Sequence, residues 1–290
     1  MSRTRIPVGR VELAALASGT IEAAPGPVIG LTDTGAAASI GPGRGHTLIV
    51  AWPGLGTTTV LRTLAAQYAR RGTHVDVLDV SGQHAWARGQ QRVHLHEDAG
   101  SIHRRLLQLA DQVRAERKGR PRVVLVESDQ TINTLLRFRH YPHPGGTGLD
   151  ALTTVLAGGL LCGIRVVMAC RAVPVPITHV AQDLFATRLL AAPTPRTWQL
   201  VGAPGAPVPD EPFRAGLMHL VHGGGHQRLR LLQLTPLQAA HLATTSGPIG
   251  TPTRWRRPRL RRRLHACHLA RLAAPAASTF QIPRIQGDFR

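Results

Sequence analysis

The chain has 290 residues, of which 43% are hydrophobic, and a formal net charge of +19 at pH 7. This length suits one large domain or two small ones, and the apolar content suffices for a full core. Aromatic residues make up only 4% of the chain, which argues against aromatic platforms for base stacking. Lys118 is the only lysine, so arginine carries the positive charge. A basic protein favours polyanions such as nucleic acid or acidic lipid. A preference for arginine over lysine, together with abundant Ala, Gly and Pro, is also typical of proteins from genomes of biased base composition.

The cysteines indicate a reducing compartment. Cys162, Cys170 and Cys267 show no C-x-x-C spacing, and two of them lie in apolar runs, so we expect buried free thiols in the cytoplasm. His265 and His268 flank Cys267 closely, but these ligands are too few for a metal site. Because no apolar stretch reaches about 18 residues, we expect no membrane span.

In chain order, residues 1–25 are weakly patterned, and apolar runs bounded by turn residues then alternate with helical stripes. A hairpin with its turn at 33–35 is expected first, and a second hairpin surrounds the glycines at 223–225. The expected strands are 27–31, 36–40, 46–50, 74–79, 93–96, 123–126, 164–169, 217–221 and 229–234, and a short run at 188–190 has no assigned structure. The expected helices are 58–71, 99–117, 131–138, 149–161, 177–184 and 236–244, and residues 191–212 are expected to form a loop.

This alternation predicts an α/β fold with a mostly parallel central sheet. The strand at 123–126 is apolar throughout, as in strands buried on both faces, so helices are expected to cover both faces of the sheet. We expect three segments: a weakly structured segment at 1–25, one α/β domain at 26–246, and a basic tail at 247–290.

The sequence after the strand at 46–50 has the order strand, glycine turn, helix, which a phosphate-binding P-loop requires. The usual pattern is G-x-x-x-x-G-K-[ST]. Here Ala51 replaces the first glycine and Thr57 replaces the lysine, whereas Gly56 and the hydroxyl residue Thr58 are present. Backbone N–H groups at a helix N-terminus would surround phosphate oxygens. The alternative is a strand-to-helix turn without a ligand. The candidate nucleotide-binding residues are Gly54, Leu55, Gly56, Thr57, Thr58 and Thr59.

The tail has a different composition from the rest of the chain. Seven arginines fall within ten residues, and Pro258 prevents a continuous helix there. Sequence-independent binding of phosphate is the natural hypothesis; the alternatives are a solvated tail and docking to an acidic partner protein. The candidate nucleic-acid-binding residues are Arg254, Arg256, Arg257, Arg259, Arg261, Arg262 and Arg263.

Taken together, the order of motifs resembles the RecA-like motor domain of the FtsK/SpoIIIE/HerA family of double-stranded DNA translocases. The resemblance covers about residues 26–244. It rests on a glycine-turn hairpin, a strand leading into the P-loop, an acidic Val-x-Val-x-Asp strand, an apolar strand that ends in an acid, and a Gly-Ile-x-Val-Val-Met-Ala sensor segment. The matching segments are 28–40, 46–59, 75–79, 122–128 and 163–172, with a closing hairpin at 217–234.

The resemblance implies ATP and magnesium as cofactors, but the residues that carry the family's chemistry are replaced. Thr58 is able to hold magnesium, whereas Thr57 cannot supply the charge of the lysine. The family's Asp-Glu pair is Glu127-Ser128 here, and its sensor Thr-Gln-Arg becomes Cys170-Arg171-Ala172. Ser128 cannot act as the base, and the neighbouring Asp129 is expected to point elsewhere because side chains at a strand end alternate in direction. A prosaic alternative is that Glu127 and Asp129 form an acidic strand-to-helix turn and that Arg171 lies at the surface.

Phosphoryl transfer depends mainly on positioning and on charge stabilisation, so these replacements remove most of the mechanism. The favoured interpretation is a pseudo-ATPase that serves as a structural, regulatory or DNA-binding subunit. The resemblance further implies an oligomer, beside an active FtsK-like homologue. A working ATP-driven DNA translocase with unusual catalytic residues is one alternative. The other is a protein-interaction scaffold that uses no nucleotide.

Overall fold

The computed structural model describes residues 11–12, 20–41, 45–137, 147–178, 181–202, 207–210, 213–223 and 225–245. The arginine-rich tail at 247–290 lies outside these residues. The described strands form one mixed sheet in the order β3-β2-β11-β10-β9-β4-β8-β7-β5-β6, and β1 (Val11–Glu12) pairs in parallel with β11.

One half of the sheet is parallel, as predicted. Strands β9, β4, β8, β7, β5 and β6 pair in parallel with one another in this order, and most of their residues are buried because helices cover both faces. Their bounds are β4 (Thr47–Val50), β5 (His74–Leu78), β6 (Val93–His96), β7 (Arg122–Val126), β8 (Ile164–Cys170) and β9 (Thr187–Leu190).

The other half of the sheet is antiparallel and consists of the two predicted hairpins. Strands β2 (Val28–Thr32) and β3 (Ala37–Ser39) form the first, whose turn contains Gly35 at a φ of +82°. Strands β10 (Leu217–His222) and β11 (Gly225–Gln233) form the second. Because β11 pairs with β2 and β10 with β9, the hairpins extend the parallel sheet.

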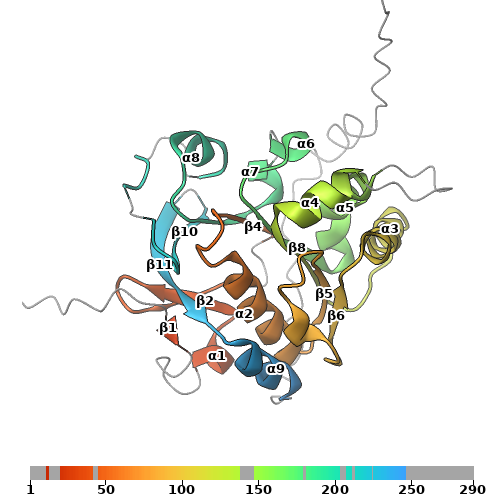
Figure 1. Cartoon of the computed structure of the whole chain (residues 1–290), viewed down its shortest axis with the longest axis horizontal. Helices are drawn as coiled ribbons and strands as arrows, with labels where there is room; N and C mark the ends of the chain where they lie inside the picture. The colour runs from red at the N-terminus through yellow and green to blue at the C-terminus, as the bar shows by residue number, and fades with distance from the viewer. Residues whose placement is uncertain are drawn as a thin grey trace, which may run out of the picture. The chain divides into compact units, whose positions relative to one another are not determined.

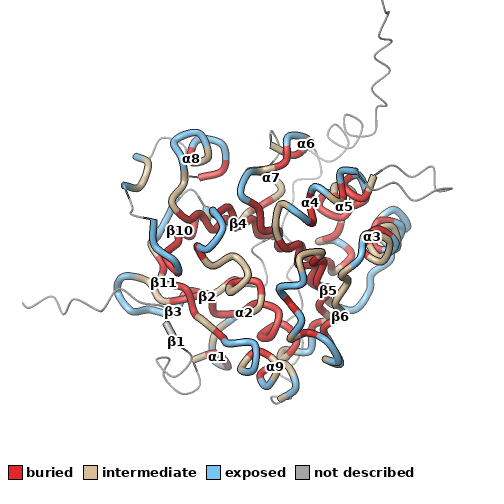
Figure 2. Tube along the Cα trace, in the orientation of Figure 1, coloured by how far each residue is buried: buried red, intermediate tan, exposed pale blue. Residues whose placement is uncertain are grey.

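Helices pack on both faces of this sheet (Figures 1 and 2). Side chains from α3, α4 and α5 share one apolar core with one set of alternating strand residues. Helix α2 packs on the opposite face, and α9 packs against α2. The longer helices are α2 (Thr57–Arg70), α3 (Ala99–Arg114), α4 (Ser128–Arg137), α5 (Gly148–Gly158) and α9 (Pro236–Thr244). Single helical turns form α1 (Thr20–Ala23), α6 (Val175–Thr178), α7 (Ala181–Leu184), η2 (Ala85–Ala87) and η3 (Gly159–Cys162).

The expectation of a loop throughout 191–212 is wrong, because helix α8 (Pro195–Val201) lies within it. The Thr194 hydroxyl accepts a hydrogen bond from the Thr197 N–H, and Pro195 occupies the first helical turn, where its missing N–H costs nothing. Trp198 is fully buried and anchors the helix. The density of Pro and Gly around this short segment concealed a helix start signal.

Candidate functional site

The candidate site lies where four neighbouring parallel strands end. In the register of the sheet, Val50 pairs with Cys170, Met168 with Val126, and Val126 with Leu78. The next residues along these strands therefore meet at one edge: Ala51, Arg171, Glu127 and Asp79. In open α/β sheets this carboxyl edge is the usual place for a ligand site.

The P-loop turns tightly between β4 and α2. The Leu55 N–H donates to the Trp52 carbonyl at 3.2 Å, and the Leu55 carbonyl accepts from the Gly216 N–H at 3.1 Å, which ties the loop to the start of β10. Gly54 and Gly56 have φ values of +84° and +114°, conformations that suit glycine. Among the described residues, no side chain caps the N-terminus of α2. Its first backbone N–H groups therefore have no side-chain acceptor, and this end of the helix is electropositive.

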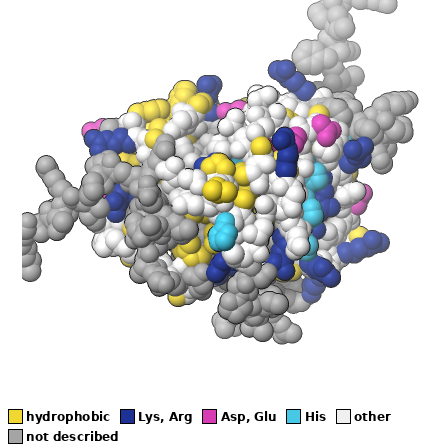
Figure 3. All heavy atoms as spheres, turned by 60° about the horizontal axis from the view of Figure 1, so that its bottom comes forward, with side chains coloured by type: hydrophobic (Ala, Val, Ile, Leu, Met, Phe, Trp, Pro, Cys, Tyr) yellow, Lys and Arg dark blue, Asp and Glu magenta, His cyan; other side chains and the backbone are white. Residues whose placement is uncertain are grey.

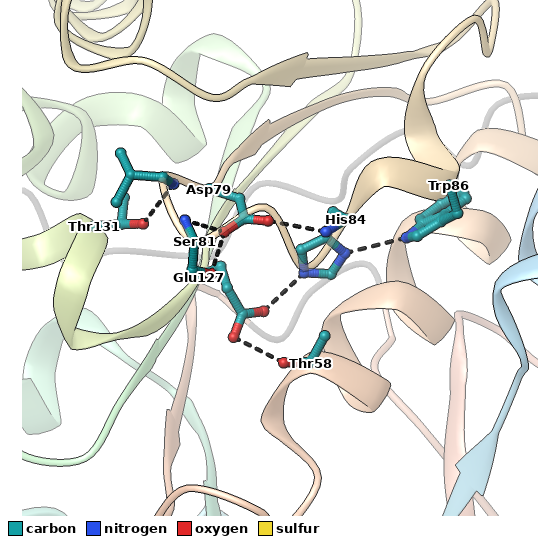
Figure 4. Close-up of polar contacts among 8 residues, drawn as sticks. Thr58, Asp79, Ser81, His84, Trp86, Glu127 and Thr131 are labelled. Atoms are coloured by element: carbon teal, nitrogen blue, oxygen red, sulfur yellow. Dashed lines mark hydrogen bonds and ion pairs between the residues drawn. The ribbon is translucent and has the colours of Figure 1, made fainter.

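The P-loop hydroxyl and the acid at the end of β7 lie within hydrogen-bond distance of each other. The Thr58 hydroxyl donates to Glu127 Oε1 at 3.0 Å, although Glu127 has a longer side chain than the aspartate of the family pattern (Figure 4). Glu127 Oε2 lies 2.7 Å from His84 Nε2. Glu127 is 2% exposed and His84 is fully buried, so hydrogen-bond donors replace water around both carboxylate oxygens.

The hydrogen bond from Trp86 determines the tautomer of His84. An indole N–H can only donate, and Trp86 Nε1 lies 3.1 Å from His84 Nδ1, so Nδ1 accepts and Nε2 carries the proton toward Glu127. Asp79 holds the loop that presents His84: its Oδ2 accepts from the His84 N–H and its Oδ1 from the Ser81 N–H, each at 2.9 Å. The result is a continuous chain, Trp86–His84–Glu127–Thr58, which we call the site chain (Figure 4).

The position of the catalytic base contains no base. Ser128 has a φ of +66°, and its buried Oγ has no hydrogen-bond partner among the described residues. A left-handed conformation at a non-glycine residue costs of order 1–3 kcal/mol and persists only where surrounding structure enforces it. Asp129 points elsewhere, as expected: its carboxylate accepts from the Arg171 N–H at 3.0 and 3.2 Å and joins the ends of β7 and β8.

Two arginines lie near the loop, and each has other partners. The Arg171 guanidinium stacks over Trp52 at 4.9 Å from the ring centroid, and Trp52 also contacts Phe213. Arg62 Nε donates to the Leu234 carbonyl at 2.8 Å. Burial lowers the pKa of Arg62, although the charge of Glu127 opposes that shift. The Arg171 guanidinium is thus engaged by Trp52, and the Arg62 Nε by the Leu234 carbonyl.

Sequence reasoning missed three residues of the site: Asp79, His84 and Trp86. Asp79 carried a usable signal, because it follows a strand that pairs directly with the strand before Glu127. His84 and Trp86 lie in an irregular segment at 81–89, where no periodicity marks them.

Other sequence-based candidates lie beyond the described residues. The arginines from Arg254 to Arg263 and the group His265, Cys267 and His268 are among them. Within the described residues, no group of three or more His, Cys, Asp or Glu side chains is arranged to hold a metal ion. The described helices include none that is both long enough and apolar enough to cross a membrane.

The sheet order and the P-loop at its carboxyl edge define the class of fold: a mostly parallel α/β sheet of the P-loop type. Neither a family model nor a curated protein matches the chain. Among solved structures, the pCW3 conjugation coupling protein TcpA, in a monomer form with ATPγS, is similar with a TM-score of 0.62 and 14% identity over 82% of this chain and 75% of that one.

Two secretion-system structures share the fold. EccC of Thermomonospora curvata (ATPases 2 and 3), in complex with a signal sequence peptide, has a TM-score of 0.60 and 15% identity over 78% of this chain and 43% of that one. The cytoplasmic domain of EssC has a TM-score of 0.59 and 15% identity over 78% of this chain and 47% of that one. The chain thus spans less than half of either structure. The likeness confirms the FtsK/SpoIIIE/HerA-type fold that the motif order predicted.

Proposed function

We propose that this chain is a pseudo-ATPase: a P-loop module that retains a phosphate cradle but does not hydrolyse ATP. It would act in the cytoplasm as a structural, regulatory or DNA-binding subunit of an oligomer, beside an active FtsK-like homologue. The observation that carries the proposal is the site chain, in which His84 and Thr58 occupy both oxygens of Glu127 while the adjoining residue, Ser128, offers no base.

The residues fit the binding part of an ATP–magnesium site only partly. The uncapped N-terminus of α2 suits phosphate oxygens, and the Thr58 oxygen retains lone pairs for magnesium while its proton is donated to Glu127. Magnesium would supply charge that neutralises the phosphates. The lysine that normally spreads this charge is Thr57, so nucleotide affinity is expected to be weak.

The residues do not fit the hydrolytic part. A water nucleophile needs a group that orients it and accepts its proton, and the Ser128 hydroxyl is not basic at neutral pH. Glu127 is the nearest carboxylate, but two donors hold it and its role is positional. Asp129 is hydrogen-bonded to the backbone of Arg171. No hydrolytic step is therefore assigned to this chain.

The proposal is tested by restoring the missing groups. The double variant Thr57→Lys with Ser128→Glu should bind a fluorescent ATP analogue with magnesium at least about tenfold more tightly than the natural chain, since a new charge-assisted contact to phosphate contributes about 1.4 kcal/mol or more. The matched control for the new lysine is Asn133→Lys, which adds one positive charge on the exposed face of α4, away from the P-loop; the new glutamate leaves the net charge of the double variant unchanged.

Each outcome of this test is informative. Tighter binding only in the double variant, with or without turnover, supports a cradle that lost its charge. ATP hydrolysis by the natural chain that duplex DNA stimulates would favour the active translocase instead. Equal binding by the double variant and the Asn133→Lys control would contradict a retained cradle and favour a scaffold that uses no nucleotide.

A further inference from the structure

Cationic and imidazole groups gather at β6, the edge strand of the sheet. Three strands, β8, β7 and β5, separate β6 from the P-loop strand β4. In β6 the apolar residues Val93 and Leu95 pack on the α2 side, so the alternating residues His94 and His96 lie on the α3 side. We call the following groups the edge cluster: the imidazoles of His74, His94 and His96 and the guanidinium groups of Arg92, Arg120 and Arg122.

Beneath the edge cluster lies one carboxylate whose charge is already neutralised. Asp76 is 1% exposed and accepts hydrogen bonds from Arg122 at 2.7 Å and from Arg105 of α3 at 3.0 Å, with His96 at 3.4 Å. Burial alone would raise the pKa of Asp76, but the hydrogen bond from His96 and the charges of both arginines outweigh it and hold the pKa well below its usual range. Asp76 is therefore ionised, and two guanidinium groups exceed its single charge.

Two imidazoles of the edge cluster lie side by side next to these arginines. His74 and His94 stack with their ring centroids 6.0 Å apart and their planes at 8°. Burial lowers the pKa of His74, and Arg122, His94, Arg120 and Arg92 lower it further.

The pKa of His94 responds to the same charges. Burial lowers it, Asp76 opposes that shift, and Arg122, Arg105 and His96 add to it. The buried Nδ1 of His74 has no hydrogen-bond partner among the described residues, so the edge cluster is not a closed network.

Protection of a sheet edge against aggregation explains charge on β6 itself. It does not explain why Arg120 and Arg122, which belong to β7 and the turn before it, add to the same field. A lipid surface fits less well, because the large exposed apolar side chains of the described residues lie outside β5, β6, β7 and α3. In Figure 3, imidazoles lie beside basic side chains toward the right of the view, where Figure 1 places β6 and α3.

We propose that the edge cluster binds the phosphate backbone of duplex DNA, as a surface separate from both the P-loop and the arginine-rich tail. Guanidinium groups form paired hydrogen bonds with phosphate, and such contacts position a protein on DNA without reading sequence. The edge cluster offers no large aromatic side chain on which an unpaired base would stack, which favours a duplex over a single strand. The inference does not depend on whether the P-loop binds ATP.

The test uses the full chain without nucleotide and a fluorescently labelled DNA duplex, with anisotropy measured across a series of salt concentrations. The variant is Arg92→Gln with Arg120→Gln. The matched control, Arg137→Gln with Arg196→Gln, removes the same charge from exposed residues of α4 and α8. Loss of two phosphate contacts should lower the slope of log affinity against log salt by about 1.8 and weaken binding about tenfold, whereas the control should change the slope by less than about 0.5.

A second arm uses the histidines. Phosphate favours the protonated imidazole, so affinity should rise as pH falls from 8 to 6, and His94→Gln should remove much of this rise while His241→Gln on α9 should not. Equal effects of the two arginine variants, or no effect of either, would overturn the proposal. Loss of binding to anionic lipid vesicles with unchanged DNA binding would overturn it as well.

Discussion

Removing the imidazole of His84 should destabilise the protein strongly, because it breaks the centre of the site chain. The His84→Ala variant leaves the buried Glu127 Oε2 and the indole N–H of the half-buried Trp86 without their partners. A hydrogen bond to a charged group contributes about 1.5–3 kcal/mol and a neutral one about 1 kcal/mol. The free energy of unfolding should therefore fall by about 2.5–4 kcal/mol, with a decrease in melting temperature of roughly 5–16 °C.

Two comparisons separate the hydrogen bonds from simple loss of volume. Trp86→Phe keeps an aromatic ring and removes one neutral hydrogen bond, so it should cost about 1 kcal/mol. His241→Ala, at an exposed position, should change stability by less than about 0.5 kcal/mol.

The assay is urea unfolding followed by circular dichroism, with a double-mutant cycle between His84→Ala and Glu127→Ala. A coupling energy of about 2 kcal/mol is expected. A coupling below about 0.5 kcal/mol, with a cost below 1 kcal/mol for His84→Ala, would contradict a stabilising hydrogen bond between His84 and Glu127.

Two further predictions concern the P-loop at the carboxyl edge of the sheet, and a third concerns His46 at the opposite end of β4. Thr58→Val keeps the shape of the side chain but leaves Glu127 Oε1 without its donor, so unfolding free energy should fall by about 1–2 kcal/mol in urea titrations, and no loss would contradict this contact. Gly56 has a φ of +114°, so Gly56→Ala should lower the unfolding free energy by about 1–3 kcal/mol in the same titrations. The control Gly35→Ala, at a φ of +82° in an exposed turn, should lower it less. The opposite order would contradict the P-loop conformation. Burial lowers the pKa of His46 to about 3, below its unfolded value of about 6.5. The folded state therefore favours the neutral ring, and the free energy of unfolding should fall as pH drops from 6.5 toward 3. Thermal melts that show no such fall would contradict this assignment.

Much of the fold was predictable because its local patterns and its packing agree. The apolar runs at β7 and β8 indicate buried strands, as the structure shows. Both hairpins form at the turns that their glycines predict. Helix α8 was missed because composition was weighed above the local signal of Thr194 and Pro195. Sequence patterns report which face of an element is buried, and they report less about short elements between turns.

The candidate site was only partly predictable. The motif order placed Thr58 and Glu127 in one site, because Thr58 lies in the first turn of the helix after β4, Glu127 follows β7, and both strands end at one edge of the sheet. The hydrogen bond between the two side chains was not itself predicted. His84 is a residue of an irregular segment, and only the three-dimensional course of that segment brings its ring to Glu127. The Trp86 contact that fixes the tautomer of His84 depends on side-chain geometry, which no spacing rule encodes.

The central claim is that the chain lacks ATP hydrolysis, and turnover by the purified natural chain tests it most directly. The measurement is phosphate release from ATP with magnesium, with and without duplex DNA, beside a Glu127→Gln variant purified in the same way. The account predicts equal, background-level release by both proteins under both conditions. Magnesium-dependent release that duplex DNA stimulates and Glu127→Gln abolishes would contradict it.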